Sequence, residues 1–286
     1  MNGNDLRTRL ASGDPVLMPG VWDALSARLA ANAGFDVVFQ SGYAVSGTLL
    51  GRPDFGYVTQ VEQADVARRV CDANRDVMVV VDGDTGYGNA LNVIRTVELW
   101  EAAGAAGVFI EDQVWPKRCG HMAGKLVVPT EDWLAKLRAA CDARRTLHVT
   151  ARTDARAAVS LDEAIERAKM ARDCGVDALF VEAPQSAQEM EVIASALDGI
   201  TLVANMVEAG RTPLLTPSEL AQLGFTLIVS PVSLLFAATK AMQRTAAHLR
   251  DEGTMREHLD ELCGFDEFGT IVGLPDAFAL EARYAR

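Results

Sequence analysis

Three carboxylates stand where two consecutive apolar runs of the chain end. Asp82 and Asp84 follow VMVVV (77–81), and Glu111 closes GVFIE (107–111). Residues two apart on a strand share a face, and the ends of neighbouring parallel strands meet at one edge. Carboxylates that close together repel one another unless a cation compensates them, and oxygen ligands favour Mg²⁺ or Mn²⁺. The spacing therefore predicts a Mg²⁺ or Mn²⁺ site.

A structural interpretation of the same acids stays open, because an Asp-x-Asp pair alone is a weak motif. Asp84 could open a turn before the glycines that follow it, and Glu111 could pair with Arg152. In that case the acids would stabilise the fold and bind no metal.

A polar loop, VWPKRCGHMAGKLVVP, follows the second carboxylate-bearing run and is long enough to close over a site. Its residues with chemical potential are Lys117, Arg118, Cys119, Gly120 and His121. Flanking positive charge lowers the pKa of a thiol, which makes Cys119 a candidate acid near neutral pH. The alternatives are a surface loop with an incidental cysteine, and a histidine that holds the loop rather than the substrate.

Eight short apolar runs, separated by segments of helical periodicity, must position these groups. Eight such units of about thirty residues match a closed parallel (β/α)₈ barrel, whose active site lies at the carboxyl ends of the strands. An open doubly wound sheet is the alternative, but no GxGxxG follows the first run. The expected strands are 16–18, 37–40, 77–81, 107–111, 147–152, 178–182, 201–206 and 226–231.

Helix ends are marked by residue type. Glycines 34, 104, 175 and 224 each precede a strand, where a left-handed helix end costs glycine no strain. Helix starts are expected at Thr130, Ser160 and Thr216, each of which precedes acidic residues. We therefore expect one barrel domain over residues 1–286, with 252–286 as a helical tail.

Composition narrows the class of protein. The chain has 286 residues and a formal net charge of −12, which argues against nucleic acid or an anionic membrane as partner. Five scattered cysteines form no CxxC pair, and no apolar run has the length of a signal peptide or a membrane span. These features predict a soluble, cytoplasmic protein whose other cysteines, 71, 141, 174 and 263, are incidental.

Taken together, the motifs resemble the isocitrate lyase and phosphoenolpyruvate mutase superfamily over nearly the whole chain. KRCGH in the loop after strand four is typical of its carbon–carbon lyases, and DQVWPKRCGHMAGK is most similar to the 2,3-dimethylmalate lyase and petal death protein type. The motifs are SGY (41–43), LGRPDFG (50–56), VDGDTGYGN (81–89), EDQVWPKRCGH (111–121), ARTDA (151–155), VEAP (181–184) and ANMVEAG (204–210).

The resemblance implies roles for individual residues. It implies a metal held by Asp82 and Asp84, with Glu111 and Asp54 acting partly through water, and it implies homotetramers that exchange a C-terminal helix. The expected catalytic residues are Cys119 as acid, Tyr43 as base, Lys117 and Glu111. The expected substrate-binding residues are Ser41, Gly42, Tyr43, Cys119, Gly120, His121, Arg152, Glu182 and Asn205.

One departure bears on the substrate. Methylisocitrate lyases carry an arginine for an additional carboxylate in the segment that matches SPVSLLFAA, where this chain has Phe236. Burying a carboxylate without its partner costs several kcal/mol. The resemblance thus favours Mg²⁺-dependent cleavage of a small 2-hydroxy dicarboxylate, such as 2,3-dimethylmalate or citramalate. Oxaloacetate hydrolysis or decarboxylation, a carboxyphosphonoenolpyruvate or phosphonate mutase reaction, and dicarboxylate binding without turnover remain alternatives.

Overall fold

Eight parallel strands close into a barrel in the computed structural model, which describes residues 1–120 and 124–285. Each strand pairs with the next along the chain, and β1 pairs with β8. This closure confirms the predicted (β/α)₈ barrel and excludes the open sheet. The strands are β1 Val16–Val21, β2 Val37–Gln40, β3 Met78–Asp82, β4 Gly107–Glu111, β5 His148–Thr153, β6 Ala178–Val181, β7 Thr201–Asn205 and β8 Phe225–Ser230.

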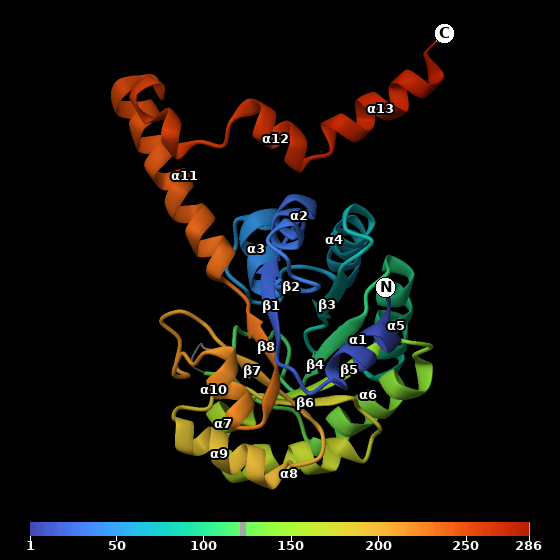
Figure 1. Ribbon diagram of the computed structural model, residues 1–286. Coiled ribbons are helices and arrows are strands. Elements are labelled where there is room, and N and C mark those ends of the chain that lie inside the picture. The colour runs from blue at the N-terminus through green and yellow to red at the C-terminus, as the bar shows by residue number, and fades with distance from the viewer. Residues whose placement is uncertain (121–123, 286) are drawn as a thin grey trace. The chain divides into compact units, whose positions relative to one another are not determined.

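Helices surround these strands, as Figure 1 shows for residues 1–233. They bury an apolar stripe against the outer side of the barrel, for example through Val93, Val97 and Trp100. The helices of this unit are α1 Gly3–Leu10, α2 Ala24–Asn32, α3 Gly42–Leu50, α4 Gln60–Ala73, α5 Ala90–Ala103, α6 Thr130–Ala143, α7 Ala155–Ala158, α8 Leu161–Arg172, α9 Ala187–Ala196 and α10 Pro217–Gln222.

The helix ends follow the residue types. Glycines 34, 104, 175 and 224 have φ angles of 95°, 92°, 83° and 97°, so all four predictions of a left-handed residue are confirmed. Ser160 and Thr216 cap α8 and α10 through their side chains. Helix α6 begins at Thr130, as predicted, but its N-cap is Pro129, which makes no side-chain cap hydrogen bond.

The barrel interior is filled by side chains from alternate strands. Phe39, Phe109 and Phe180 belong to β2, β4 and β6. The ring centroid of Phe109 lies 5.0 Å from that of Phe39 and 5.7 Å from that of Phe180. The amino end of the barrel is covered by α1, which buries Leu6 and Leu10 in the same core cluster. Packing at this end leaves the opposite, carboxyl end of the strands for polar residues.

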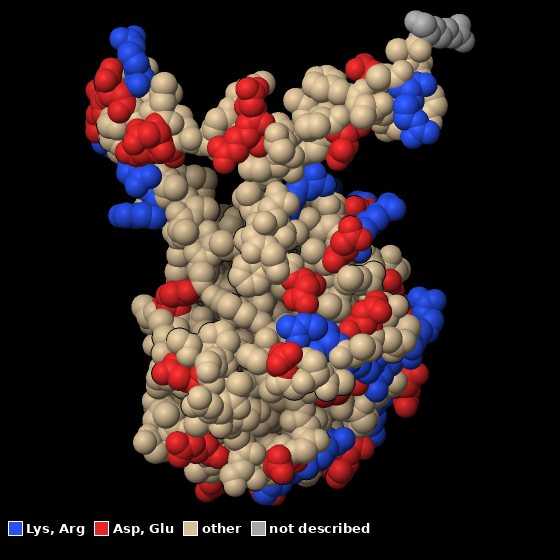
Figure 2. All heavy atoms as spheres, viewed as in Figure 1, with Lys and Arg blue, Asp and Glu red and all other residues tan. Residues whose placement is uncertain are grey.

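Two compact units make up the described chain, Met1–Ser233 and Leu234–Arg286. The second consists of helices, and the tail expected from residue 252 falls within it. No helix within residues 1–120 and 124–285 has both the length and the apolar character needed to span a membrane. Acidic and basic side chains are interspersed on the face of the barrel unit drawn in Figure 2. The elements of the second unit are α11 Ser233–Glu252, η1 Arg256–Glu261, α12 Phe265–Ile271 and α13 Leu274–Tyr284.

Candidate active site

The strand register brings the predicted polar residues to one end of the barrel. Asp82 is the last residue of β3 and pairs with Phe109, while Glu111 at the end of β4 pairs with Arg152 of β5. Arg152 in turn pairs with Phe180, and its guanidinium lies 5.3 Å from the centre of that ring. The aromatic layer of the interior therefore forms part of the floor beneath these polar groups.

Four carboxylates are buried at this end. Asp54, Asp82, Asp84 and Glu111 are at most 8% exposed. Burial, together with the carboxylates of Asp82 and Asp54, raises the pKa of Asp84 to about 7 against the opposing effect of Lys117. Burial also raises the pKa of Glu111 well above its usual value. The raised pKa values show that the protein alone does not fully stabilise the ionised form of these carboxylates.

Lys117 lies among these acids. Its ammonium is 2.6 Å from Oδ1 of Asp54 and 2.6 Å from Oδ1 of Asp84. Burial alone would lower the pKa of Lys117, but Asp84, Asp54 and Asp82 together raise it well above its usual value. Lys117 is consequently a charged, buried cation that partly compensates the carboxylates.

The acids suit a hard divalent cation, and one further observation tests this. Oε1 of Glu111 is buried and has no hydrogen-bond partner, so a ligand atom is available there. Within the described residues, no three acidic groups at this end bring their ligand atoms within 4.8 Å of one another. A Mg²⁺ ion usually keeps several waters and uses only one or two carboxylates directly, so wider spacing is compatible with it.

Arg152 ties the acidic end to the next two strands. It forms ion pairs with Asp154 at 3.0 Å, Glu182 at 3.2 Å and Glu111 at 3.5 Å. The pair with Glu111, which the structural interpretation of the acids anticipated, therefore exists and is the longest of the three. Nδ2 of Asn205 donates to both carboxylate oxygens of Glu182, at 3.3 Å and 3.2 Å. Arg152, Glu182 and Asn205 therefore form one cluster.

The cysteine-bearing loop is fastened to this cluster. A Cβ atom on Gly120 would lie 2.5 Å from Nη2 of Arg152 and 2.6 Å from Cδ of Glu182, so the loop backbone packs directly on both side chains. Nζ of Lys125 is 2.6 Å from Asp154 and donates to the Gly120 carbonyl. These contacts hold the segment that contains Cys119 against the barrel end.

The two basic side chains that precede Cys119 in the loop, Lys117 and Arg118, contact groups other than its thiol. Lys117 pairs with Asp54 and Asp84, and the guanidinium of Arg118 lies 5.7 Å from the centre of the Phe55 ring. Cys119 is partly exposed and lies near enough to Tyr43 to affect its pKa. His121, a predicted substrate contact, lies outside the described residues.

The segment SGY places backbone and side-chain groups opposite the loop. Ser41 caps α3 by accepting a hydrogen bond from the backbone N–H of Ala44. A Cβ on Gly42 would lie 2.7 Å from Oδ2 of Asp82, so only glycine allows this approach. The pKa of Tyr43 is raised by burial and by its neighbours Cys119 and Asp54. Tyr43 is therefore a neutral phenol in the free protein.

Sequence reasoning missed a buried support beneath these residues. Asp112 accepts hydrogen bonds from Thr153 Oγ1 at 2.7 Å and from the backbone of Asp154 at 2.8 Å, and it pairs with Arg167 at 3.1 Å. Lys125 and Asp154 form a second buried ion pair. A signal was present, because Asp112 and Asp154 directly follow strands and Lys125 belongs to the polar loop.

A closed barrel with an acidic, loop-covered carboxyl end defines a (β/α)₈ enzyme. The family model for phosphoenolpyruvate phosphomutase matches residues 6–250. The chain belongs to this family.

Three curated relatives span most of the chain. A chloroplastic carboxyvinyl-carboxyphosphonate phosphorylmutase of Arabidopsis thaliana is 47% identical, over 94% of this chain and 81% of the relative. The petal death protein of Dianthus caryophyllus is 44% identical, over 94% and 85%. The 2,3-dimethylmalate lyase of Eubacterium barkeri is 40% identical, over 98% and 97%. The relatives thus include a lyase and a mutase.

Solved structures of similar fold belong to the same group of enzymes. A 2,3-dimethylmalate lyase of the phosphoenolpyruvate mutase and isocitrate lyase superfamily superimposes with a TM-score of 0.94 and 34% identity, over 98% of this chain and 94% of that one. Oxaloacetate acetylhydrolase with 3,3-difluorooxalacetate gives 0.93 and 33%, over 98% and 96%. A phosphonopyruvate hydrolase complex with oxalate and Mg²⁺ gives 0.89 and 28%, over both full chains. The predicted superfamily is confirmed, and the chain is one of its enzymes.

Proposed function

We propose that the protein is a Mg²⁺-dependent carbon–carbon lyase. It cleaves a small 2-hydroxy dicarboxylate, a 2-alkylmalate such as 2,3-dimethylmalate or citramalate, into a 2-oxo acid and a carboxylic acid. The observation that carries this proposal is the attachment of the Cys119 loop to the acidic barrel end, through Lys117, Gly120 and Lys125. A proton donor held beside buried carboxylates suits a reaction that leaves negative charge on carbon.

The metal would be held by Asp82 and Asp84, with Glu111 and Asp54 reached partly through water. When bound there, Mg²⁺ or Mn²⁺ supplies positive charge that offsets the substrate carboxylate and 2-oxygen. Support comes from the excess of buried negative charge, from the unpartnered Oε1 of Glu111, and from the phosphonopyruvate hydrolase of similar fold, which was solved as a complex with oxalate and Mg²⁺.

The protein's own groups would orient the substrate. Backbone N–H groups at the start of α3, near Ser41, Gly42 and Tyr43, suit a carboxylate, because the first amides of a helix lack partners within the helix. Arg152 lies beside Glu182 and Asn205 on the other side of the acids and would stabilise charge that develops during cleavage. Gly120 and His121 belong to the loop that would close over the substrate.

Cleavage requires one proton to leave oxygen and one to reach carbon. Tyr43 would take the proton of the 2-hydroxyl group, so that the carbon–carbon bond breaks and its electron pair passes to the departing carbon. Its raised pKa means that added positive charge must first favour the phenolate. Cys119 would then give its thiol proton to that carbon and regain one from solvent. Lys117 and Glu111 would balance charge beside the reacting groups.

A second function is favoured by specific comparisons. The Arabidopsis thaliana relative is named a phosphorylmutase, and the oxaloacetate acetylhydrolase structure superimposes closely. A phosphonate mutase reaction or oxaloacetate hydrolysis at the same site is therefore the alternative. Cleavage of a 2-alkylmalate and hydrolysis of oxaloacetate both leave a carbanionic carbon that must receive a proton, whereas a phosphonate mutase reaction delivers no proton to carbon.

The test is a substrate panel. Purified protein with Mg²⁺ is incubated separately with 2,3-dimethylmalate, citramalate, oxaloacetate, methylisocitrate and phosphonopyruvate, and release of 2-oxo acid or oxalate is followed. We expect the highest kcat/KM with a 2-alkylmalate and little turnover of methylisocitrate, because Phe236 replaces an arginine. Efficient turnover of oxaloacetate or a phosphonate with inert alkylmalates would establish the alternative.

We also propose a homotetramer in which C-terminal helices are exchanged between subunits. Helices α12 and α13 expose large apolar side chains in the single chain, with Phe265 90% exposed and Phe278 59% exposed. Large exposed apolar side chains gathered on neighbouring helices are typical of protein contacts. Light scattering of the full chain and of a chain ending after Gly264 tests this, because only the full chain should be tetrameric.

A further inference from the structure

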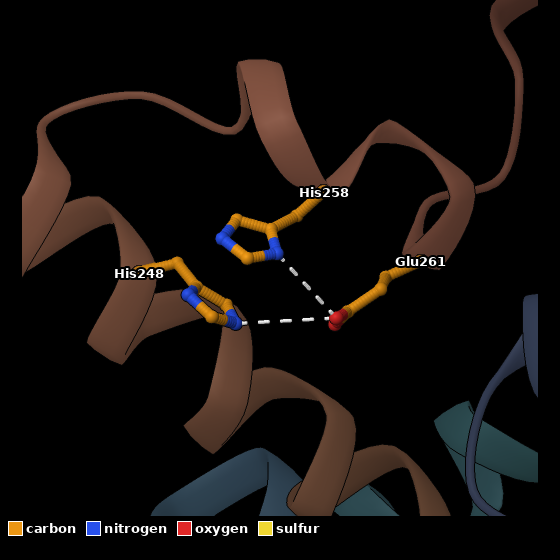
Figure 3. Close-up of side chains that lie close together, drawn as sticks. All are labelled: His248, His258 and Glu261. Carbon is orange, nitrogen blue, oxygen red and sulfur yellow. Dashed lines mark ion pairs between the residues drawn. The ribbon is translucent and has the colours of Figure 1, made fainter.

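Two histidines and two glutamates meet within the second unit. His248 and Glu252 belong to α11, whereas His258 and Glu261 belong to η1. Figure 3 shows the two imidazole rings one above the other, with Glu261 at one edge. The ring centroids are 3.6 Å apart and the ring planes differ by 25°.

Glu252 fixes how the rings present their nitrogens. Its carboxylate lies 2.9 Å from Nδ1 of His248 and 3.0 Å from Nε2 of His258. A carboxylate accepts hydrogen bonds, so both of these nitrogens carry the ring proton. In the neutral rings, the lone pairs then lie on Nε2 of His248 and Nδ1 of His258.

Both lone pairs face a further acceptor. Oε1 of Glu261 is 4.0 Å from Nε2 of His248 and 3.7 Å from Nδ1 of His258, which is too long for a hydrogen bond. The other oxygen of Glu261 is engaged by Arg244, so Oε1 is the atom directed at the rings. Three acceptor atoms facing one another without a proton between them form a site for a cation.

The donor set and spacing indicate which cation. His248, His258 and Glu261 are the described residues whose potential ligand atoms all lie within 4.8 Å of one another. Two ligands at about 2.1 Å from a tetrahedral zinc ion are about 3.4 Å apart, so small side-chain shifts would close the site. Imidazole nitrogens favour zinc over Mg²⁺ or Ca²⁺, and metal-bound histidines commonly donate their second N–H to a carboxylate, as both do here to Glu252.

We propose that His248, His258 and Glu261 bind a zinc ion, with water as fourth ligand and Glu252 as the group that orients both histidines. Because α11 ends at Glu252 and η1 begins at Arg256, the ion would join the end of the long helix to the segment leading to α12. Binding at such a link stabilises the linked conformation. The site is therefore a structural clip for the beginning of the C-terminal segment.

The test uses the full-length protein, freed of metal and then kept in millimolar Mg²⁺ so that the carboxylates of the barrel end are occupied. Zn²⁺ affinity is measured by competition with a chromophoric chelator. We expect one tight site per chain, weakened more than about 100-fold in His258→Gln and about 10- to 100-fold in Glu252→Gln. Co²⁺ should give the visible absorption of a tetrahedral site in the wild type.

Matched variants separate this site from other binding. Glu257→Gln changes an exposed neighbour in η1 that is no ligand and should leave Zn²⁺ affinity within threefold. Asp84→Asn should also retain the tight site, because Asp84 belongs to the barrel end. Circular dichroism shows whether the variants fold. Equal Zn²⁺ affinity of wild type, His258→Gln and Glu252→Gln would overturn the proposal, as would loss of the tight site in Asp84→Asn alone.

Discussion

Nζ of Lys117 lies 2.6 Å from Oδ1 of Asp84, in the interior of the acidic site. Both side chains are almost completely buried, and Asp54 contacts the same ammonium. Lys117 thus supplies positive charge at the carboxylates to which we assign the metal. The stability of the metal-free protein should depend on this lysine.

Replacing Lys117 by Gln tests that dependence. Removing one partner of a buried ion pair leaves an uncompensated charge and costs about 3–5 kcal/mol. We expect a loss of this order in the free energy of unfolding in EDTA, and a smaller loss in Mg²⁺, which would restore positive charge. Denaturant titrations in both buffers measure the difference. Lys169→Gln, which removes an exposed ion pair with Glu166, is the control and should cost less than about 1 kcal/mol.

Asp84→Asn should abolish turnover while leaving the fold intact. The substitution weakens the metal site, but it also removes a carboxylate whose pKa is raised to about 7 by burial and by Asp82 and Asp54 despite Lys117. The measurements are kcat for 2-oxo acid release and the thermal midpoint. EDTA should inactivate the wild type reversibly. Full activity of a folded Asp84→Asn protein would contradict the metal assignment, while Asp65→Asn on the exposed face of α4 serves as control.

Gly120→Ala tests the contact between the loop and the barrel end. The new methyl group would overlap Arg152 and Glu182, at 2.5 Å and 2.6 Å from the nearest atoms. Displacing catalytic groups by about 1 Å costs about 10²-fold in rate, so we expect kcat/KM to fall by that order with little change in stability. Gly47→Ala is the matched control, since its Cβ meets no atom within 4 Å. Equal activity of the two variants would show that loop seating is unimportant.

His148 should make stability depend on pH. Burial lowers its pKa to about 4 from the ordinary 6.5, although Asp177 opposes the shift. Below pH 6.5 the unfolded chain takes up a proton that the folded protein takes up only near pH 4. The free energy of unfolding should therefore fall with pH across this window, by about 3 kcal/mol at about 1.4 kcal/mol per pH unit.

His148→Gln isolates this effect. Asp84 and Asp112 have raised pKa values and give the opposite trend, but they are present in both proteins, so the difference between wild type and variant reports His148. We expect the wild type to lose about 3 kcal/mol more than the variant between pH 7 and pH 4. Parallel pH profiles from denaturant unfolding would refute the assignment.

The barrel could be predicted from the sequence because its determinants are local. Each strand is a short apolar run buried on both faces, and glycines such as Gly104 and Gly175 mark where helices end. The start of α6 at Thr130 was predicted correctly, although Thr130 is the first helical residue after Pro129 and not the capping residue. Helix α1 was not predicted, since a helix of eight residues depends on tertiary contacts, here the burial of Leu6 and Leu10 against the finished barrel.

The site was predictable only in part. Residues that follow strands, such as Asp82, Glu111 and Arg152, meet because the topology places all strand ends together. The pairing of Lys125 with Asp154 joins residues 29 positions apart, and a lysine in a polar loop normally predicts a solvated side chain. Such pairings depend on the folded path of the loop, which no local pattern specifies.

Cys119→Ser distinguishes the proposed lyase from a phosphonate mutase. Cys119 stands between Lys117, which is fixed to Asp54 and Asp84, and Gly120, which packs on Arg152. If its thiol protonates the carbanionic product, serine should lower kcat by about 10²- to 10⁴-fold, the usual share of general acid catalysis. Substrate affinity should change little, because serine is similar in size and still forms hydrogen bonds.

The measurement is kcat for 2-oxo acid release from the best 2-alkylmalate, with affinity followed separately by calorimetry. Cys174→Ser is the matched control, because Cys174 lies just after α8 and belongs to none of the assigned groups. Phosphonate mutase chemistry delivers no proton to carbon and should be much less sensitive, whereas oxaloacetate hydrolysis also needs a proton on the carbon of its acetate product and is distinguished by the substrate panel. If chemistry limits the rate and kcat falls less than about threefold, the acid role is wrong and the phosphonate reaction becomes the better assignment, since general acid catalysis contributes far more than that.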